Sequence, residues 1–453
     1  MVIMEEQILS KVEQKKSESV EMLSRLVRIP SLTGEEGAAQ EFLASHARSL
    51  GMSVELREPD IEMIFRKYPE SAQYPTHWRH DLILAYNSLA TFEALMKSGK
   101  SDVLNYKDRP NLTARLEGRG GGRSLLLAGH IDNVTVEPRG EWRFDPFGAH
   151  GEKGMMYGRG TSDMKGGLCA ALQAVRCLLD CGVELRGDVL FASAVNEEHS
   201  GNGMLSIVAE GLRADAAIVM EPSRNQVYIA TPGDVYWEVV LKGEPRSPGS
   251  RWEGEAMVGV SAIEKLSPAI EALLKVEQDH NLMKPHPLYR GSNPFSCVIG
   301  EIAGGTYPTV TAGECKIRGC MYFGPSMGSV NEIMDRIRDR VAEETSKDPW
   351  FKDHPAVVQF LHHRNSVTTA PREPIIQAVH DAVKMVNPAA DTVVAGSPFC
   401  SDMEYLVNQG GIPSVLFGPG WIGHAHKANE CIDIKEYLES IKVLALAIYR
   451  WCS

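Results

Sequence analysis

The sequence predicts an α/β protein whose larger domain is built on a mostly parallel sheet and is interrupted by an inserted α+β sandwich domain. Short apolar runs alternate with helical patterns over most of the chain, which is typical of parallel strands joined by helices. From about 232 to 345 this pattern gives way to two consecutive strand–helix units, which predict a four-stranded sheet with two helices on one face. At 453 residues the chain also exceeds one ordinary core. We therefore expect the larger domain at 1–231 and 346–453, and the inserted domain at 232–345.

Composition and charge favour a soluble globular enzyme. Hydrophobic residues make up 43% and charged residues 23% of the chain. The formal net charge of −12, from 47 basic and 59 acidic residues, argues against nucleic acid or an anionic membrane as the main partner. No apolar run is long enough to span a membrane, and the charged segment 1–20 lacks the apolar core of a secretory signal. The nine cysteines show no Cys-x-x-Cys spacing, so we expect free thiols in a reducing compartment, the cytoplasm.

The N-terminal part is expected to contain two helices and a strand. Apolar residues fall on one stripe from about 6 to 28, which predicts a helix, and Pro30 breaks the pattern. A second helix is expected at about 36–50 and a strand at 53–56. The segment 60–107 is rich in aromatic residues, and three interpretations stay open for it: a cover over a site entrance, a subunit contact, or a surface excursion without a function.

The central part predicts three buried strands and a helix. The apolar runs 124–128, 188–195 and 214–220 are short, and polar residues follow each of them closely. The glycine-rich run 158–167 lacks the Gly-Lys-Ser/Thr ending of a phosphate-binding loop and leads into a helix at about 166–181. In parallel sheets ligands bind at the carboxyl ends of the strands, which is where these polar residues fall.

The remaining elements follow from the same patterns. In the inserted domain they are strand 235–241, helix 260–277, strands 296–302 and 314–323, and helix 328–345. After Pro349 they are helix 374–386, strand 392–395, helix 401–408, strand 414–417 and helix 434–450. The last part of the chain therefore returns to the larger domain.

Polar groups that bind metal ions or protons gather at the predicted strand ends. His130 and Asp132 alternate along one strand and so share a face, where one can bind a metal and the other can orient it. Each polar group alone has a structural explanation, such as a helix cap, a turn or a solvated pair. Together they supply enough imidazole and carboxylate ligands for two divalent cations, and such ligands without thiolates suit zinc, cobalt or manganese. The set comprises His130, Asp132, Asp163, Glu197, Glu198, Glu221 and His426.

Five motifs spread over most of the chain resemble those of one enzyme family. They are Gly-His-Ile-Asp at 129–132, the glycine-rich run at 158–167, Asn-Glu-Glu at 196–198, Met-Glu-Pro at 220–222, and Gly-Pro-Gly at 418–420 followed by Ala-His at 425–426. In combination they resemble the co-catalytic zinc amidohydrolases and exopeptidases, which include acetylornithine deacetylase, succinyl-diaminopimelate desuccinylase, aminoacylase and glutamate carboxypeptidase. The resemblance implies that the inserted sandwich is a lid domain that also forms a homodimer interface.

The resemblance also implies metal-binding roles for five residues. Asp163 would bridge two divalent ions, with Zn²⁺ preferred and Co²⁺ or Mn²⁺ as alternatives. His130 and Glu221 would complete one site. Glu198 and His426 would complete the other.

Two further residues would support the reaction. Glu197 would be the general base, and Asp132 would orient His130. Water between two metal ions becomes hydroxide-like near neutral pH, and a free carboxylate beside it can take its proton and return that proton to the leaving nitrogen. Relatives have a cis peptide after the bridging aspartate, which predicts a cis bond between Asp163 and Met164.

Three departures from the family pattern concern the substrate. Where many relatives place a histidine that steadies the oxyanion, four residues after Gly243, this chain has Ser247. Where relatives that bind a substrate carboxylate place an arginine on a strand of the inserted domain, it has Cys320, with Arg318 on the same face. Many relatives also have arginine after an Asp-Met pair, and here that position is Glu404. The metal-binding residues are therefore intact, while the groups that bind an α-carboxylate are altered.

The function expected from these features is that of a cytoplasmic metal-dependent hydrolase. It would cleave the amide bond of a small N-acyl compound, such as an N-acyl amino acid or a dipeptide, with a metal-bridged water activated by Glu197. One alternative is a hydrolase of an atypical amide or aromatic amine, which Ser247, Cys320 and Glu404 favour. The other is a non-catalytic metal-binding relative, against which the intact metal ligands and Glu197 argue.

Overall fold

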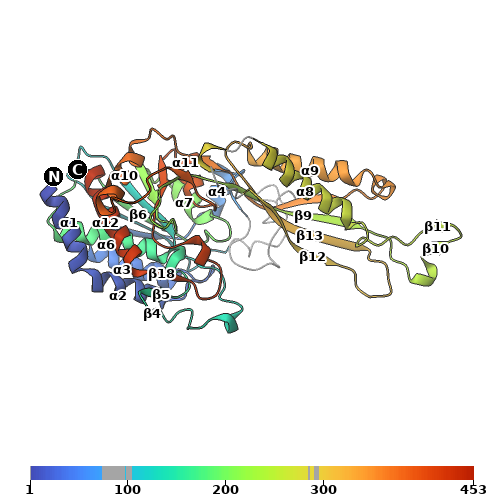
Figure 1. The fold of residues 1–453 in the computed structure, drawn as a ribbon, viewed down its shortest axis with the longest axis horizontal. Coiled ribbons are helices and arrows are strands. Elements are labelled where there is room, and N and C mark those ends of the chain that lie inside the picture. The colour runs from blue at the N-terminus through green and yellow to red at the C-terminus, as the bar shows by residue number, and fades with distance from the viewer. Residues whose placement is uncertain (1, 74–96, 98–104, 284–285, 290–294) are drawn as a thin grey trace. The chain divides into compact units, whose positions relative to one another are not determined.

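The described residues fold into two units, each with its own sheet. The computed structural model describes residues 2–73, 97, 105–283, 286–289 and 295–453. Unit 1 comprises the described residues up to Ala230 and those from Val367 to Ser453, and unit 2 comprises those from Thr231 to Ser366. Figure 1 shows the elements of both units. The α/β class predicted from the sequence is confirmed.

Unit 1 is built on a sheet whose centre is parallel. Its strands are β1 (Ser53–Arg57), β2 (Asn111–Leu116), β3 (Leu125–His130), β6 (Val189–Ala194), β7 (Ala216–Val219), β8 (Tyr228–Thr231), β15 (Val367–Thr368), β16 (Ala395–Gly396) and β17 (Ser414–Leu416). Their order is β1-β2-β6-β3-β7-β17-β8-β15, with β16 paired to β8. β3 pairs in parallel with β6 and β7, whereas β1 and β2 form an antiparallel edge. All six residues of β3 are buried, as expected for a central strand covered on both faces.

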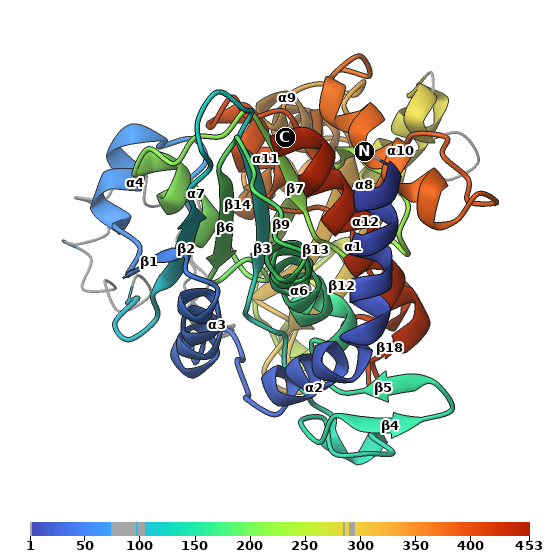
Figure 2. The same cartoon turned by 90° about the vertical axis from the view of Figure 1, so that its left-hand side faces the viewer.

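The helices of unit 1 pack in two groups. The first contains α1 (Val2–Gln14), α2 (Lys16–Val27), α6 (Gly166–Asp180), α10 (Pro374–Val386) and α12 (Ile434–Cys452), and α6 and α12 contact β3. Figure 2 shows α1, α6 and α12 together. The second contains α4 (Ile61–Lys67), α7 (Asn202–Ala209) and α11 (Met403–Asn408), while α3 (Gly37–Ser49) contacts β1 and β2. The single helix expected at 6–28 is in fact two helices, because the helical backbone is interrupted at Lys15.

A small sheet that the sequence patterns did not predict joins two distant parts of unit 1. It consists of β4 (His150–Glu152), β5 (Met155–Tyr157) and β18 (Cys431–Asp433), in the order β18-β5-β4. Cys431 pairs with Tyr157. The glycine-rich run after β5 therefore lies beside the segment that precedes β18, and these two segments carry Asp163 and His426.

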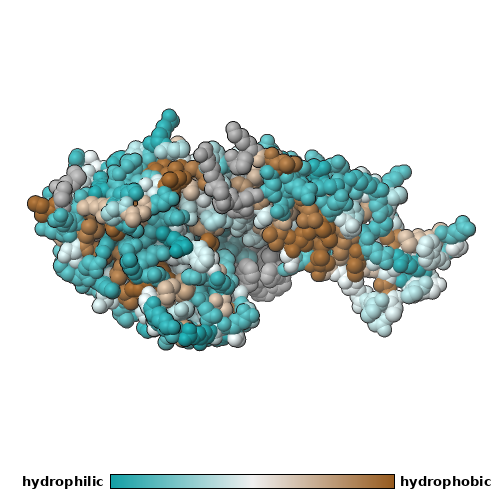
Figure 3. Space-filling view, in the orientation of Figure 1, coloured by the Kyte–Doolittle hydropathy of each residue, from teal (hydrophilic) through white to brown (hydrophobic). Residues whose placement is uncertain are grey.

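Unit 2 is a four-stranded antiparallel sheet with two long helices. Its strands β9 (Gly233–Lys242), β12 (Cys297–Gly304), β13 (Glu314–Phe323) and β14 (Val357–Arg364) have the order β12-β13-β9-β14. Helices α8 (Leu266–Leu282) and α9 (Val330–Thr345) pack against each other. A short hairpin is formed by β10 (Trp252–Glu253) and β11 (Ala256–Met257). Exposed apolar side chains gather over the strands of this unit (Figure 3). Val298 and Ile302 of β12 are among the exposed large apolar residues.

Two expectations about boundaries need correction. The inserted unit continues to Ser366 instead of ending at 345, because β14 pairs with β9 and so belongs to its sheet. The strand expected at 392–395 is reduced to the two residues of β16. Of the aromatic segment 60–107, residues 74–96 and 98–104 lie outside the described residues. In the part of the chain that the structure describes, no helix is long and apolar enough to cross a membrane.

Candidate metal centre

The topology of the central sheet brings three groups of polar residues to one edge. β3 lies between β6 and β7, and all three strands run in the same direction. His130 is the last residue of β3, Glu197 and Glu198 follow β6, and Glu221 follows β7. Because the carboxyl ends of parallel strands meet at one edge of a sheet, these side chains converge although they are far apart in sequence.

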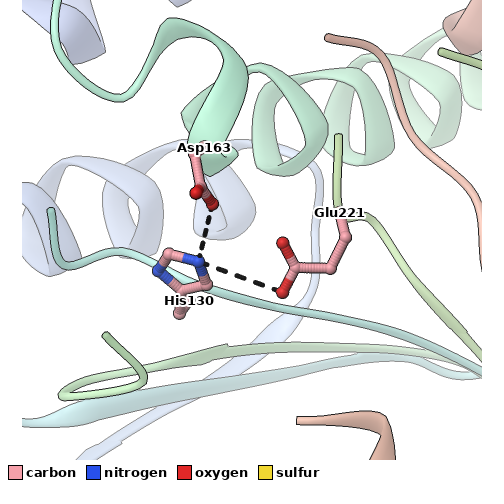
Figure 4. A group of neighbouring side chains, drawn as sticks. All are labelled: His130, Asp163 and Glu221. Carbon is pink, nitrogen blue, oxygen red and sulfur yellow. Dashed lines mark hydrogen bonds and ion pairs between the residues drawn. The ribbon is translucent and has the colours of Figure 1, made fainter. Parts of the chain in front are cut away.

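The carboxylate of Asp163 completes this cluster by facing two imidazoles. Its Oδ1 lies 3.1 Å from Nε2 of His130, and its Oδ2 lies 3.3 Å from Nε2 of His426. The same nitrogen of His426 lies 2.8 Å from Oε2 of Glu198, and Nε2 of His130 lies 4.0 Å from Oε1 of Glu221. Figure 4 shows His130, Asp163 and Glu221 pointing toward one another. Asp163 therefore stands between two sets of potential ligands, with one oxygen directed at each.

The donor atoms fit two divalent cations that share Asp163. Within the described residues, ligand atoms of His130, Asp163 and Glu221 lie within 4.8 Å of one another, and so do those of Asp163, Glu198 and His426. Each group offers one imidazole nitrogen and two carboxylates, without a thiolate. This donor set suits zinc, and it also suits cobalt or manganese.

Glu197 lies beside the group formed by His130, Asp163 and Glu221 and belongs to neither ligand group. Its Oε2 is 4.0 Å from Nε2 of His130, and only 7% of the residue is exposed. A carboxylate that stands beside a metal group, and is not needed to complete it, is in a position to exchange a proton with a water molecule there.

Asp132 orients His130 and also holds the backbone that follows β6. The Nδ1 atom of His130 lies 3.0 Å from the backbone carbonyl of Asp132 and 3.5 Å from its Oδ1. A carbonyl only accepts, so Nδ1 carries the proton and Nε2 of the neutral ring is left to bind a cation. The Asp132 carboxylate also accepts hydrogen bonds from the backbone N–H groups of Glu197 (3.0 Å) and Glu198 (3.2 Å) and from the hydroxyl of Thr33 (2.8 Å).

Burial and crowding shift the titration of these groups. Burial raises the pKa of Glu198 to about 7 and raises the pKa of Glu221 well above its usual value. Burial by itself would lower the pKa of His130, but hydrogen bonds to Asp132 and Asp163 raise it well above its usual value. The charge of Glu198 raises the pKa of His426. The cluster therefore holds protons where a divalent cation would bind, and the cation must displace them.

A buried ion pair supports the turn that carries Asp163. One oxygen of Glu430 accepts hydrogen bonds from the backbone N–H groups of Ser162 (2.9 Å) and Asp163 (3.1 Å). Its other oxygen lies 2.7 Å from Nη1 of Arg159. Glu430 was missed by the sequence analysis, because no local pattern links it to residues so far away along the chain.

The bond between Asp163 and Met164 is cis, as expected.

Glycines of the run 158–167 and of the Gly-Pro-Gly motif at 418–420 allow backbone segments to approach one another closely. A Cβ atom on Gly167, at the start of α6, would lie 2.1 Å from the carbonyl oxygen of Met220. A Cβ atom on Gly418 would lie 2.4 Å from the same oxygen. Only glycine permits these approaches. They bring the start of α6 and the loop after β17 against the end of β7, next to Glu221.

The predicted substrate-binding residues lie in different surroundings. In unit 2, Ser247 precedes a short turn of 3₁₀ helix, and Cys320 lies in β13 opposite β9. The guanidinium of Arg318 is paired with a buried carboxylate of the neighbouring strand, with Nε 2.7 Å from Oε2 of Glu238. In unit 1, Glu404 is buried in α11. Arg318 is therefore engaged with a carboxylate of its own sheet.

Comparison with known proteins gives consistent matches over most of the chain. Residues 126–450 match the sequence model of the peptidase family M20/M25/M40. The N-formyl-4-amino-5-aminomethyl-2-methylpyrimidine deformylase of Halalkalibacterium halodurans is 32% identical over 365 residues, which is 77% of this chain and 84% of that protein.

Solved structures with the same fold have much lower sequence identity. The dipeptidase Dug1p of Saccharomyces cerevisiae aligns with a TM-score of 0.74 at 13% identity, over 99% of this chain and 98% of that one. A dinuclear metal-binding peptidase of Bacillus subtilis aligns with a TM-score of 0.60 at 14% identity, over 97% and 99%. These matches agree with the broad family predicted from the motifs. The similar sequence is a deformylase, however, and not one of the four enzymes named for the resemblance.

Proposed function

This chain belongs to the peptidase family M20/M25/M40 and is a metallohydrolase of C–N bonds; from that premise we propose that it removes a short acyl group, such as formyl, from an amine that carries no α-carboxylate. The observation that carries the reaction type is the position of Asp163, whose two oxygens face two different imidazoles. Sequence similarity to a deformylase supports the acyl group. The proposal favours the atypical amide over an N-acyl amino acid or a dipeptide.

In this proposal two divalent ions are held by five side chains. His130 and Glu221 would hold one, Glu198 and His426 would hold the other, and Asp163 would contribute to both. Zinc is preferred, because imidazole and carboxylate ligands without thiolates suit it. When bound, such ions polarise the amide carbonyl and lower the pKa of water.

The proton transfers are assigned to Glu197. Its carboxylate takes a proton from the attacking water as the new carbon–oxygen bond forms, and delivers that proton to nitrogen as the carbon–nitrogen bond breaks. The products are a carboxylic acid, formic acid in the case of a formyl group, and a free amine; near neutral pH the acid then releases its proton and leaves as the carboxylate. The hydrogen bond from the backbone N–H of Glu197 to Asp132 supports this role, because it links the base to the residue that orients His130.

The charges near the site support an amine without a carboxylate. The pKa of Glu221 is raised first by burial and then by neighbouring carboxylates, of which Asp402 at the start of α11 is one. Glu404 follows two residues later and is buried, and in this proposal its carboxylate lies near the leaving amine. Negative charge of this kind disfavours an anionic substrate and favours a neutral or cationic one. The pairing of Arg318 with Glu238 removes a cation that could have bound a carboxylate.

We also propose that unit 1 is the catalytic domain and that unit 2 joins two copies of the chain into a homodimer. β12 is an edge strand of the described sheet, and its Val298 and Ile302 are 55% and 57% exposed. An exposed apolar edge strand is a surface that another strand can cover. All nine cysteines are free thiols, which supports a cytoplasmic location.

The test is a substrate panel with the zinc-loaded protein. It compares N-formyl-4-amino-5-aminomethyl-2-methylpyrimidine with N-acetyl and N-succinyl α-amino acids and with dipeptides, and it measures kcat/KM from the amine released. We expect the N-formyl aminomethylpyrimidine to be preferred by about tenfold or more. A best substrate with an α-carboxylate would reject the proposed amine. Absence of turnover for the whole panel with metal bound would favour the non-catalytic alternative.

A further inference from the structure

The residue before Glu197 has an unusual backbone conformation. β6 ends at Ala194, and Asn196 then has a φ of 61°, in the left-handed region that residues with side chains seldom adopt. Asparagine tolerates this region better than most residues, because its short polar side chain forms local hydrogen bonds. The direction in which the chain leaves β6, and with it the position of Glu197, therefore depends on how Asn196 is held.

The side chain of Asn196 is held by a phenol and a hydroxyl. Its Nδ2 donates hydrogen bonds to Oη of Tyr106 at 2.6 Å and to Oγ of Ser200 at 2.8 Å. Its backbone carbonyl accepts from the N–H groups of Ser200 (3.2 Å) and Gly201 (2.8 Å). Asn196 is fully buried. Ser200 belongs to the same turn as Asn196, whereas Tyr106 comes from a distant part of the sequence, so Tyr106 ties the turn to the rest of unit 1.

Tyr106 is itself fixed by a buried ion pair. The guanidinium of Arg109 lies 4.7 Å from the centroid of the Tyr106 ring. Nε and Nη2 of Arg109 bind the two oxygens of Glu36 at 2.7 and 2.8 Å, and both side chains are buried. A bidentate pair of this kind has little freedom to move. The phenol oxygen is therefore presented to Asn196 from a rigid support.

The backbone at Glu197 is thus fixed from two sides. On one side, Asp132 accepts a hydrogen bond from the N–H of Glu197 at 3.0 Å. On the other side, the conformation of Asn196 is supported by Tyr106 at 2.6 Å. Asp132 also acts on His130 and Glu198, so its replacement would disturb the metal ligands as well. The hydrogen bond of Tyr106 to Asn196, in contrast, involves neither Asp132 nor a proposed metal ligand.

We propose that Tyr106 is a positioning residue for the general base, acting through Asn196; this inference rests on the proposed function, in which Glu197 carries the protons. Proton transfer requires the carboxylate to lie within hydrogen-bonding distance of the water molecule, and small displacements of a reacting group are costly in rate. Removal of the phenol oxygen leaves a buried amide N–H without this acceptor, so the Asn196 turn relaxes and the carboxylate of Glu197 is displaced.

The first test is Tyr106→Phe, with Tyr437→Phe as its matched control. Tyr437 is a fully buried phenol whose oxygen donates to the carbonyl of Ser19 at 3.0 Å, within the α-helical part of unit 1. We expect both variants to lose similar thermal stability. At saturating zinc, Tyr106→Phe should lower kcat by about tenfold or more with KM and metal content unchanged. Tyr437→Phe should leave kcat at the wild-type value, because its hydrogen bond does not support the turn before Glu197.

The second test is a double-mutant cycle with Asn196→Gly, which accepts the left-handed backbone but lacks the amide. If Tyr106 acts through Asn196, the double variant Tyr106→Phe, Asn196→Gly should have a kcat no more than about twofold below that of Asn196→Gly alone. Full additivity of the two effects, or a kcat of Tyr106→Phe within about twofold of wild type, overturns the inference. Glu197→Ala separates this failure from failure of the proposed function: if that variant keeps full activity, Glu197 is not the base.

Discussion

Glu430 and Asp163 lie 267 residues apart in sequence, yet the backbone N–H of Asp163 donates a hydrogen bond of 3.1 Å to the carboxylate of Glu430. The same carboxylate is paired with Arg159, and both side chains are at most 3% exposed. Glu430 stands four residues after His426 and directly before β18. It therefore connects the segment that supplies Asp163, which both metal groups share, with the segment that supplies His426, which belongs to the second group.

The first prediction concerns Glu430→Gln. The amide can still accept from the backbone, but Arg159 is left as a buried cation without a charged partner, which costs about 3–5 kcal/mol of the free energy of unfolding. We expect lower thermal stability together with weaker zinc binding, measured by calorimetric titration. Glu5→Gln is the control, because it breaks the ion pair of Glu5 with Arg450 at the start of α1, with Oε1 and Nε 2.7 Å apart. Wild-type zinc affinity in Glu430→Gln would show that the pair serves only the fold.

The second prediction concerns Glu197→Ala. If Glu197 carries protons and does not bind metal, kcat should fall by at least ~10² while the metal content stays at the wild-type value. Steady-state kinetics and elemental analysis of the same preparation measure both quantities. Loss of metal in this variant would instead make Glu197 a ligand, and the proposed role of Glu198 would then need revision.

The polar residues that the fold brings together at the candidate site carry local signals in the sequence. Buried strands that end in polar residues, together with short motifs, identify His130, Glu198 and Glu221 without knowledge of the tertiary fold. The supporting residues have no such signal. Glu430 binds a turn 267 residues away in sequence, and Tyr106 accepts a hydrogen bond from Asn196, 90 residues away, so only the folded chain reveals them.

The limits of the fold prediction have the same origin. β14 was missed because its buried second half carries the polar residues His362, His363 and Arg364, which break the apolar pattern of a buried strand. The ion pair of Arg318 with Glu238 depends on the register between β13 and β9, in which the two residues are partners. Register between strands that are distant in sequence is set by packing, and local propensity does not encode it.

The third prediction concerns removal of metal. Chelation should abolish activity, and zinc, cobalt or manganese should restore it, because the proposed reaction needs a cation in each of the two ligand groups. Metal that binds only the folded state also stabilises it, by about 2.7 kcal/mol at a free concentration of 100 times Kd. The thermal midpoint should therefore rise with metal in wild type, and rise less in His130→Ala. A metal-free preparation with full activity would contradict the proposal.

The fourth prediction concerns Glu404→Gln. Removal of this buried carboxylate should weaken discrimination against anionic substrates, so the ratio of kcat/KM for N-acetyl α-amino acids to that for N-formyl amines should rise by about tenfold. Glu210→Gln is the control, since Glu210 is a half-buried carboxylate at the end of α7 with a hydrogen bond to Ser206. An unchanged ratio in Glu404→Gln, with normal metal content, would remove Glu404 from the choice of substrate.

The last prediction concerns the pH dependence of metal binding. In the metal-free protein, the charge of Glu198 and a hydrogen bond to Asp163 raise the pKa of His426, so His426 holds a proton that a cation must displace. Burial raises the pKa of Glu198 to about 7, so Glu198 holds a second proton at lower pH. Because the metal-bound form is the deprotonated one, zinc affinity should fall as the pH falls through about 7. More protons should be released on binding near pH ~6 than near pH ~8, since Glu198 adds its proton to that of His426. Calorimetric titration in buffers with different ionisation enthalpies counts these protons, and equal release at both pH values would contradict the prediction.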